Sequence, residues 1–226
     1  MKTKHGQGKI TSGIVPGTIA LKTLNFVKSQ LPKWRDMSGR PLVVGEEELN
    51  GQLCKWLNVA ARRENFAMAY FHHEERQGKK HRVDLSALPL EPQVIEGRSY
   101  NVLKPFLVLE CKRLPAPRSD REREYVTGKD KKSGGIQRFK LGLHGENLNY
   151  AGIIGYVQAD TFDNWFKAIN DWIMELAGGS SEWSLDDRLA ELSIDVLNRI
   201  ASCESTHSRV KAETTLVRLS HLWVGM

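Results

Sequence analysis

Cysteine is scarce in this chain of 226 residues, occurring only at positions 54, 111 and 203. None of the three belongs to a Cys-x-x-Cys pair, which argues against a disulfide framework or a structural zinc site and for a reducing compartment. No run approaches the ~18 apolar residues of a membrane span. The first residues also lack the apolar core of a secretory signal. We therefore expect a cytoplasmic protein without a membrane anchor.

Several motifs that define enzyme classes are also missing, including a P-loop, a dinucleotide fingerprint and an HExxH zinc motif. The sequence also contains no internal repeat. What is present is a composition with 40% hydrophobic residues, enough for a real core and against wholesale disorder. The net charge of +6 is modest. It is compatible with a phosphate-backbone partner without establishing one. Basic residues cluster at 76–82 and 113–140.

The most informative segment is residues 105–112, which read Pro-Phe-Leu-Val-Leu-Glu-Cys-Lys. Four consecutive apolar residues predict a strand buried on both faces. Because side chains alternate along a strand, Glu110 and Lys112 share one face and Cys111 points to the other. A second acid, Asp84, interrupts another strand-like run at 81–88. Charges at the end of a buried strand are costly unless they are paired or bind metal.

Asp84 followed by Glu110-Cys111-Lys112 resembles the motif of the PD-(D/E)XK, or restriction-endonuclease-like, nuclease superfamily, over about residues 45–175. One departure is Val83, which stands where the family name has Pro. The resemblance implies Mg²⁺-dependent hydrolysis of DNA phosphodiesters, with Mn²⁺ able to substitute and RNA less favoured as the substrate. It further implies a bacterial or phage setting such as restriction or anti-phage defence.

Site roles follow from this resemblance and from the chemistry of the side chains. Asp84 and Glu110 would hold the metal ion, and Lys112 would stabilise charge or orient the attacking water. The resemblance adds Glu46 as a helical metal ligand and Gln137 as a catalytic residue. The alternatives are a salt bridge at a sheet edge for the first three residues, a macrodipole-favoured acid for Glu46 and a surface glutamine for Gln137.

The basic residues closest to this motif are expected to contact nucleic acid. They are Arg82, Arg113, Arg138 and Lys140, with solvated side chains as the ordinary alternative. The charged loop 115–134 is either a solvated loop or a flap that contacts nucleic acid. For the histidines at 72, 73 and 81 we favour exposed positions or strand ends. For Ser205, His207 and His221 we favour packing or a dimer contact.

The pattern of apolar residues predicts an α/β fold with the order α-βββ-α-β, a mixed central sheet and flanking helices. We expect helices at 17–30 (ended by Pro32), 45–65, 135–143, 163–177 and 185–200. Strands are expected at 65–72, 81–87, 104–112, 150–159 and 214–224. The division is then an N-terminal tail and helix at 1–44, a nuclease core at 45–177, and a helix-and-strand extension at 178–226.

Two further interpretations remain alongside a nuclease. The first is a catalytically inactive nuclease fold that binds nucleic acid or a partner protein. The second is a structural subunit whose basic surface binds another protein. Because the chain contains no evident helix-turn-helix, a homodimer or a protein partner would supply specificity.

Overall fold

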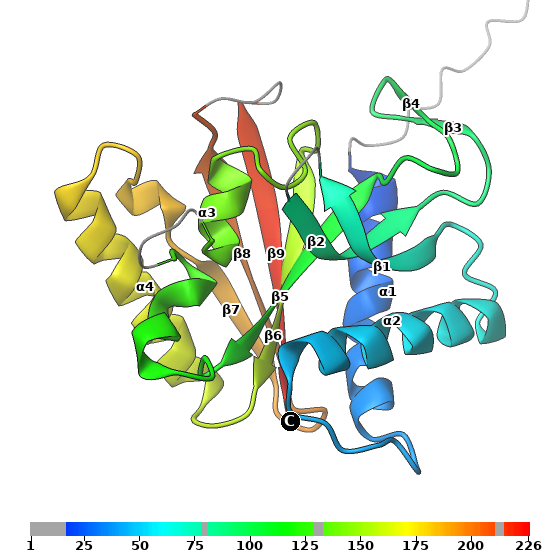
Figure 1. Ribbon diagram of the computed structural model, residues 1–226, viewed down its shortest axis with the longest axis horizontal. Coiled ribbons are helices and arrows are strands. Elements are labelled where there is room, and N and C mark those ends of the chain that lie inside the picture. Colours follow the sequence, from blue (N-terminus) through cyan, green and yellow to red (C-terminus); the bar gives the residue numbers. More distant parts are fainter. Residues whose placement is uncertain (1–16, 78–80, 129–132, 211–214) are drawn as a thin grey trace, which may run out of the picture.

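The computed structural model describes residues 17–77, 81–128, 133–210 and 215–226, which form an α/β fold around a mixed seven-stranded sheet (Figure 1). The strand order is β1-β2-β5-β6-β9-β8-β7. The central strands β5, β6 and β9 are parallel, and antiparallel strands flank them on both sides. The strands are β1 Tyr70–Gln77, β2 His81–Leu88, β5 Leu107–Leu114, β6 Tyr150–Val157, β7 Ala190–Asp195, β8 Ile200–Ser208 and β9 Leu216–Gly225.

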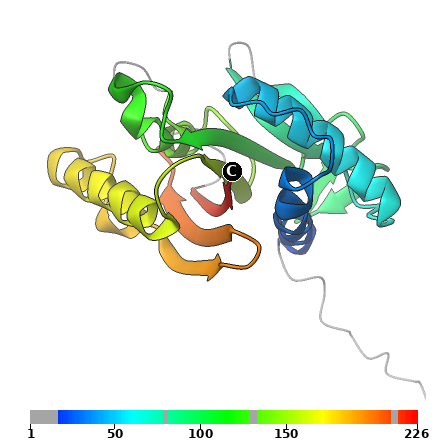
Figure 2. The ribbon, with the colours of Figure 1, turned by 90° about the horizontal axis from the view of Figure 1, so that it is seen from below.

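Helices cover both faces of this sheet (Figure 2). On one face α1 Thr18–Arg35 packs on β6 and β9, while α2 Glu46–Arg63 packs on β1, β2 and β5. The 3-10 helix η1 Ser119–Tyr125, α3 Gly135–Lys140, α4 Phe162–Gly179 and the 3-10 helix η2 Leu185–Asp187 lie together on the other side. No helix within the described residues is long and apolar enough to cross a membrane.

The first helix extends beyond the point where Pro32 was expected to end it. Pro32 lies inside α1, and its carbonyl accepts the Asp36 N–H at 3.0 Å, so the last turn forms despite the missing proline donor. Leu31 and Trp34 are buried on this turn. Burial of these two side chains therefore outweighs the local signal to stop.

The helix predicted at 185–200 is wrong. This segment contains η2, strand β7 and the start of β8, joined by a tight turn in which Asp195 accepts two hydrogen bonds from Asn198. The apolar residues that suggested a helical stripe include Val196 and Leu197, which are exposed at the hairpin tip. Residues after 178 therefore supply three strands to the same sheet rather than a helix and a strand.

Other boundaries shifted by a few residues. The first strand is β1, not 65–72, and α3 ends at Lys140 rather than at residue 143. The segment 89–101 contains a short hairpin of β3 Gln93–Ile95 and β4 Arg98–Tyr100, and the charged loop 115–134 contains η1. The predicted tail at 1–15, the turn tip at 78–80, part of the charged loop at 129–132 and the start of the last strand at 214 lie outside the described residues.

Strand β2 separates from β5 in the middle of the sheet. The two strands pair only through Ala87–Leu107, Ser86–Val108 and Leu85–Leu109, whereas β5 continues alongside β6 as far as the pair Leu114–Val157. From residue 110 onward, the edge of β5 that faced β2 therefore has no neighbouring strand among the described residues. Asp84 and Glu110 are the first residues past the last β2–β5 pair, so they lie where this open edge begins.

The turn between α3 and β6 also matters for this region, and Arg209 at the end of β8 holds it. The buried guanidinium donates to the backbone carbonyls of Phe139, Gly145, Glu146 and Leu148 at 2.7–3.0 Å. Burial lowers the pKa of Arg209 to about 10, so the side chain stays charged at neutral pH. One side chain thus satisfies the carbonyls of a turn that has no regular secondary structure.

We predict that Arg209→Met lowers the free energy of unfolding by about 3 kcal/mol, because several buried carbonyls lose their donor. Urea denaturation followed by circular dichroism measures this loss. Arg118→Met is the control, because Arg118 is largely exposed and pairs only with Asp120 on the surface. Equal stability of the two variants would contradict this account of the turn.

Candidate active site at the open edge of β5

Two carboxylates take the place of the missing strand at the open edge of β5. The Cys111 N–H donates to Asp84 Oδ2 at 2.7 Å, and the Arg113 N–H donates to Glu46 Oε2 at 3.1 Å. These amides are two residues apart, as expected for groups on the same edge of a strand. Asp84 from β2 and Glu46 from the start of α2 therefore satisfy the backbone donors that β2 leaves unpaired.

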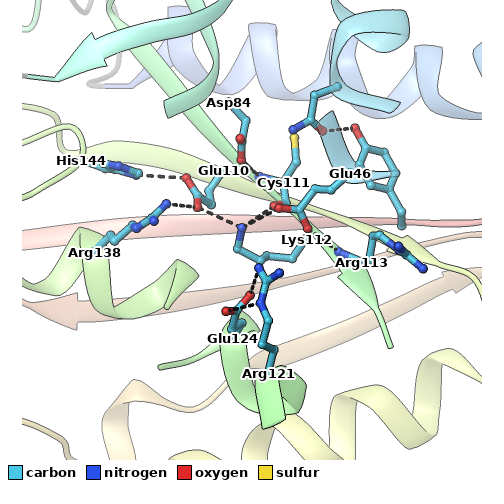
Figure 3. Close-up of polar contacts among 12 residues, drawn as sticks. Glu46, Asp84, Glu110, Cys111, Lys112, Arg113, Arg121, Glu124, Arg138 and His144 are labelled. Atoms are coloured by element: carbon cyan, nitrogen blue, oxygen red, sulfur yellow. Dashed lines mark hydrogen bonds and ion pairs between the residues drawn. The ribbon is translucent and has the colours of Figure 1, made fainter. Parts of the chain in front are cut away.

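The Lys112 ammonium lies among oxygen atoms at this edge (Figure 3). Its Nζ is 2.8 Å from the Cys111 carbonyl oxygen, 3.0 Å from Glu46 Oε1 and 3.1 Å from Glu110 Oε1. The side chain is only 9% exposed. Glu110, Lys112 and Glu46 thus lie together, and both interpretations of Glu46 fit, since it is the first residue of α2 and also faces the site.

Glu110 is the most enclosed of the acids, with a side chain 1% exposed. Besides Lys112, its carboxylate meets Arg138 Nη1 from α3 at 2.6 Å. His144 Nδ1, from the turn after α3, is 3.1 Å from Glu110 Oε2. That approach lacks hydrogen-bond geometry, and neither ring nitrogen of the buried His144 has a hydrogen-bond partner among the described residues.

The surroundings shift the pKa values of Asp84 and Glu110 in opposite directions. Burial, and then the nearby Glu110 charge, raises the pKa of Asp84 to about 7. Burial also opposes ionisation of Glu110, but Lys112, His144 and Arg138 outweigh it and lower the pKa of Glu110 to about 2. For Lys112, burial disfavours the ammonium, yet the carboxylates of Glu110 and Glu46 raise its pKa further above its usual value.

The remaining predicted residues are more scattered. The Gln137 side-chain oxygen accepts the Gly128 N–H at 3.3 Å, so this residue faces the loop before α3 instead of Glu110. Arg82 is exposed and pairs with Glu74, and Arg113 donates to the Gln158 side chain at 2.8 Å.

Lys140 does not lie on a phosphate-binding surface. It is buried, and its ammonium is 2.6 Å from Asp187 Oδ1 and 4.9 Å from the centre of the Trp183 ring. Its expected role in nucleic-acid contact is therefore corrected to a structural one. Arg138, expected at phosphates as well, contacts Glu110 instead, while its side chain remains 25% exposed.

Within the described parts of the chain, no group of three or more His, Cys, Asp or Glu side chains is arranged to hold a metal ion. The donors nevertheless have the chemistry that Mg²⁺ prefers: the carboxylates of Asp84, Glu110 and Glu46, and the Cys111 carbonyl. Two of these carboxylates and the carbonyl already surround one cation, the ammonium of Lys112. The predicted magnesium site stays a prediction.

His144 is the site residue that the sequence did not indicate. It follows α3 in an irregular turn, next to Gly145, whose backbone has a positive φ of 56°. Its ring lies against Phe139, with centroids 5.8 Å apart, and near His81 at 6.4 Å. No periodic signal could have found it, because only the folding of the turn and its attachment to Arg209 bring this ring to Glu110.

The raised pKa of Asp84 predicts a particular pH dependence in EDTA. A carboxyl whose pKa rises from 3.8 to about 7 binds its proton more tightly in the folded protein. Its contribution to stability is thus complete below pH ~4 and is lost as the pH rises to ~7. We expect the wild type to lose stability relative to Asp84→Asn over this interval in urea denaturation. Parallel pH profiles for the two proteins would contradict the raised pKa.

Comparison with known proteins assigns no relative to the chain. No protein-family model, no curated protein and no solved structure matches it. The resemblance to PD-(D/E)XK nucleases therefore depends on Asp84, Glu110 and Lys112 and on the order of the surrounding elements. The function of this site is therefore inferred from the chemistry of its own residues.

Proposed function

We propose that this protein is a metal-dependent nuclease that hydrolyses phosphodiester bonds in DNA, with the open edge of β5 as its active site. The observation that carries the proposal is the gathering of Glu46, Glu110 and the Cys111 carbonyl around one cationic group. Asp84 lies beside them, held by the same stretch of backbone. This arrangement combines hard oxygen donors with a lysine, which are the parts that phosphodiester hydrolysis requires.

In the proposed nuclease Asp84, Glu110, Glu46 and the Cys111 carbonyl would hold Mg²⁺, and Mn²⁺ would be able to replace it. A bound magnesium ion would activate a water molecule and neutralise negative charge at the scissile phosphate. The protein itself must then keep three carboxylates close together at neutral pH. The raised pKa of Asp84 reflects the cost of burying this carboxyl and of placing it near Glu110, which the Lys112 ammonium offsets only in part.

Lys112 and Arg138 supply the positive charge that the chain itself places at the proposed active site. The Lys112 ammonium remains protonated at any physiological pH, so it acts as a fixed charge that stabilises a developing oxyanion or orients water. Arg138 is partly exposed while its guanidinium meets Glu110, so in this proposal it can also contact a phosphate of the substrate. Arg82 and Arg113 are the other basic residues that would contact the phosphate backbone in this proposal.

The wider assignment follows from the same resemblance. We propose that the α2-to-α4 region is a restriction-endonuclease-like core acting in the cytoplasm of a bacterium, or in a phage, in restriction or anti-phage defence. A second copy of the chain or a protein partner would supply sequence specificity. DNA is preferred to RNA on the family resemblance.

A catalytically inactive nuclease fold is the second candidate, and one observation favours it. The Glu110 carboxylate is already engaged by Lys112 and Arg138, with His144 at ion-pair distance. A site whose central acid already has two cationic partners at one carboxylate oxygen resembles a structural ion-pair network. Such a protein would bind nucleic acid or a partner protein without cleaving.

The nuclease proposal predicts cleavage of supercoiled and linear DNA in Mg²⁺ or Mn²⁺. Lys112→Ala and Asp84→Asn are each expected to slow cleavage at least ~100-fold, the usual effect of removing one such charged group. Agarose gels at matched protein concentrations measure the rates, and Lys167→Ala on the exposed face of α4 is the control. A folded wild type that binds DNA but does not cut it would favour the inactive fold.

A second prediction tests the metal site without relying on activity. Lys112→Met removes the cation from Glu110 and Glu46, so in EDTA the variant should lose about 3 kcal/mol of stability. Mg²⁺ or Mn²⁺ can then bind between the unpaired oxygens, and binding to the folded state should restore the melting temperature. Differential scanning calorimetry with and without metal measures both effects.

Lys140→Met is the matched control for this experiment, since Lys140 is a buried lysine paired with the carboxylate of Asp187. It should be destabilised to a similar degree and gain nothing from divalent metal. A Lys112→Met protein that melts at the same temperature in EDTA and in Mg²⁺ would argue that the oxygens form no metal site.

A further inference from the structure

A second buried polar cluster lies outside the candidate site, on the C-terminal strands. Ser205 and His207 of β8 share a face with His221 of β9, because His221 pairs with Cys203 and side chains alternate along β8. Asp187 of η2 and Tyr125 of η1 approach the same face from the chain segments above it. All of these side chains are almost fully excluded from solvent.

These residues form one continuous series of short contacts. Trp223 Nε1 is 2.8 Å from the Tyr125 hydroxyl, which is 2.7 Å from His221 Nδ1. His221 Nε2 is 2.8 Å from Ser205 Oγ, which in turn is 2.6 Å from His207 Nε2. His207 Nδ1 is then 2.7 Å from Asp187 Oδ1.

The chemistry of the two ends fixes the direction of every hydrogen bond. The Trp223 indole can only donate, and an ionised Asp187 can only accept. If the Tyr125 hydroxyl accepts from Trp223, it donates to His221 Nδ1, and His221 carries its proton on Nε2. Ser205 then donates to His207 Nε2, and His207 carries its proton on Nδ1. The opposite direction would leave the Tyr125 proton unpaired in the core.

The ionisation states agree with this order. Burial lowers the pKa of both His207 and His221, so neither ring is charged at neutral pH. Burial opposes ionisation of Asp187, but hydrogen bonds from His207 and Lys140 outweigh it and lower the pKa of this acid. The cluster thus contains one negative charge, balanced by the Lys140 ammonium at 2.6 Å.

Asp187, His207 and Ser205 have the order of a hydrolytic triad. Ser205 is buried, however, and its oxygen is engaged by both histidines. A nucleophile in this position has no route to a substrate. The arrangement therefore suits a fixed internal connection and not a second active site.

Both ends of the series meet the segment that carries α3. At one end Tyr125 directly precedes Val126, whose carbonyl accepts the Gln137 N–H at 3.0 Å. A Cβ at Gly135 would lie 2.9 Å from the Tyr125 carbonyl, so the start of α3 rests on this backbone. At the other end Asp187 binds Lys140, the last residue of α3.

We propose that this hydrogen-bonded series is a positioning device that holds α3 at both ends and so keeps Arg138 against Glu110. Its members are Trp223, Tyr125, His221, Ser205, His207 and Asp187, and they act through α3 without touching a substrate. That the series holds α3 in place is independent of the proposed nuclease activity. Only the expected effect of the series on DNA cleavage rests on that function.

The test is native-state hydrogen exchange on Tyr125→Phe, which removes one hydroxyl while keeping the ring. Tyr156→Phe is the matched control, because Tyr156 is equally buried but donates to Asn50 on the opposite face of the sheet. We expect exchange of the amides at 137–141 to accelerate about tenfold in Tyr125→Phe. The same amides should be unaffected in Tyr156→Phe. Equal acceleration in both variants, or none in Tyr125→Phe, would overturn the proposal.

Nitrogen-15 NMR of the wild type gives an independent readout. The expected result is a neutral His207 protonated on Nδ1 and a neutral His221 protonated on Nε2. A charged ring or the reverse tautomer at either position would overturn the one-way series. If the protein cleaves DNA, Tyr125→Phe should also slow cleavage more than Tyr156→Phe; if it does not cleave DNA, the exchange and NMR results still test the positioning role.

Discussion

Where β2 leaves β5, the backbone of β5 loses one of its two neighbours while remaining in the interior of the protein. Buried amide groups without a partner are costly, so the N–H groups of Cys111 and Arg113 must be satisfied by other means. Asp84 and Glu46 satisfy them with carboxylates. The need to pair an interrupted strand thus brings two acids to the same place as Glu110, and the charged character of the candidate site follows from it.

Acids gathered in this way require positive charge close by. Lys112 meets that need from the same strand, and Arg138 meets it from α3. The balance is incomplete: burial, and then the charges of Glu110 and Glu46, raise the pKa of Asp84, although the Cys111 N–H and Lys112 favour its ionised form. A site with this imbalance favours an additional cation, which links the electrostatics of the edge to the proposed metal dependence.

The C-terminal strands contribute to this site from a distance. Arg209, at the end of β8, fixes the turn that carries His144, and the polar side chains of β8 and β9 connect to both ends of α3. Residues from the last quarter of the chain therefore define the surroundings of Glu110 without contacting it. The segments that come after α4 are in this sense part of the support of the candidate site.

The sequence by itself determined a buried strand carrying Glu110 and Lys112, although this strand runs Leu107–Leu114 and not 104–112, together with the long amphipathic helices α2 and α4 and the α/β class. These features depend on local periodicity and on runs of apolar residues, which a single segment carries. It also indicated that Glu110 and Lys112 share a face, because side chains alternate along a strand. The grouping of Asp84 with these two residues came from the resemblance to the nuclease motif. Only the tertiary structure decided that 185–200 forms strands, that α1 continues through Pro32, and that Lys140 is buried while His144 reaches Glu110. Three of these depend on partners distant in sequence: β8 for β7, Asp187 for Lys140, and Arg209 for the turn around His144. The continuation of α1 depends on the burial of Leu31 and Trp34. Long-range pairing and burial outweigh local propensity at such positions, and neither can be read from the residues nearby.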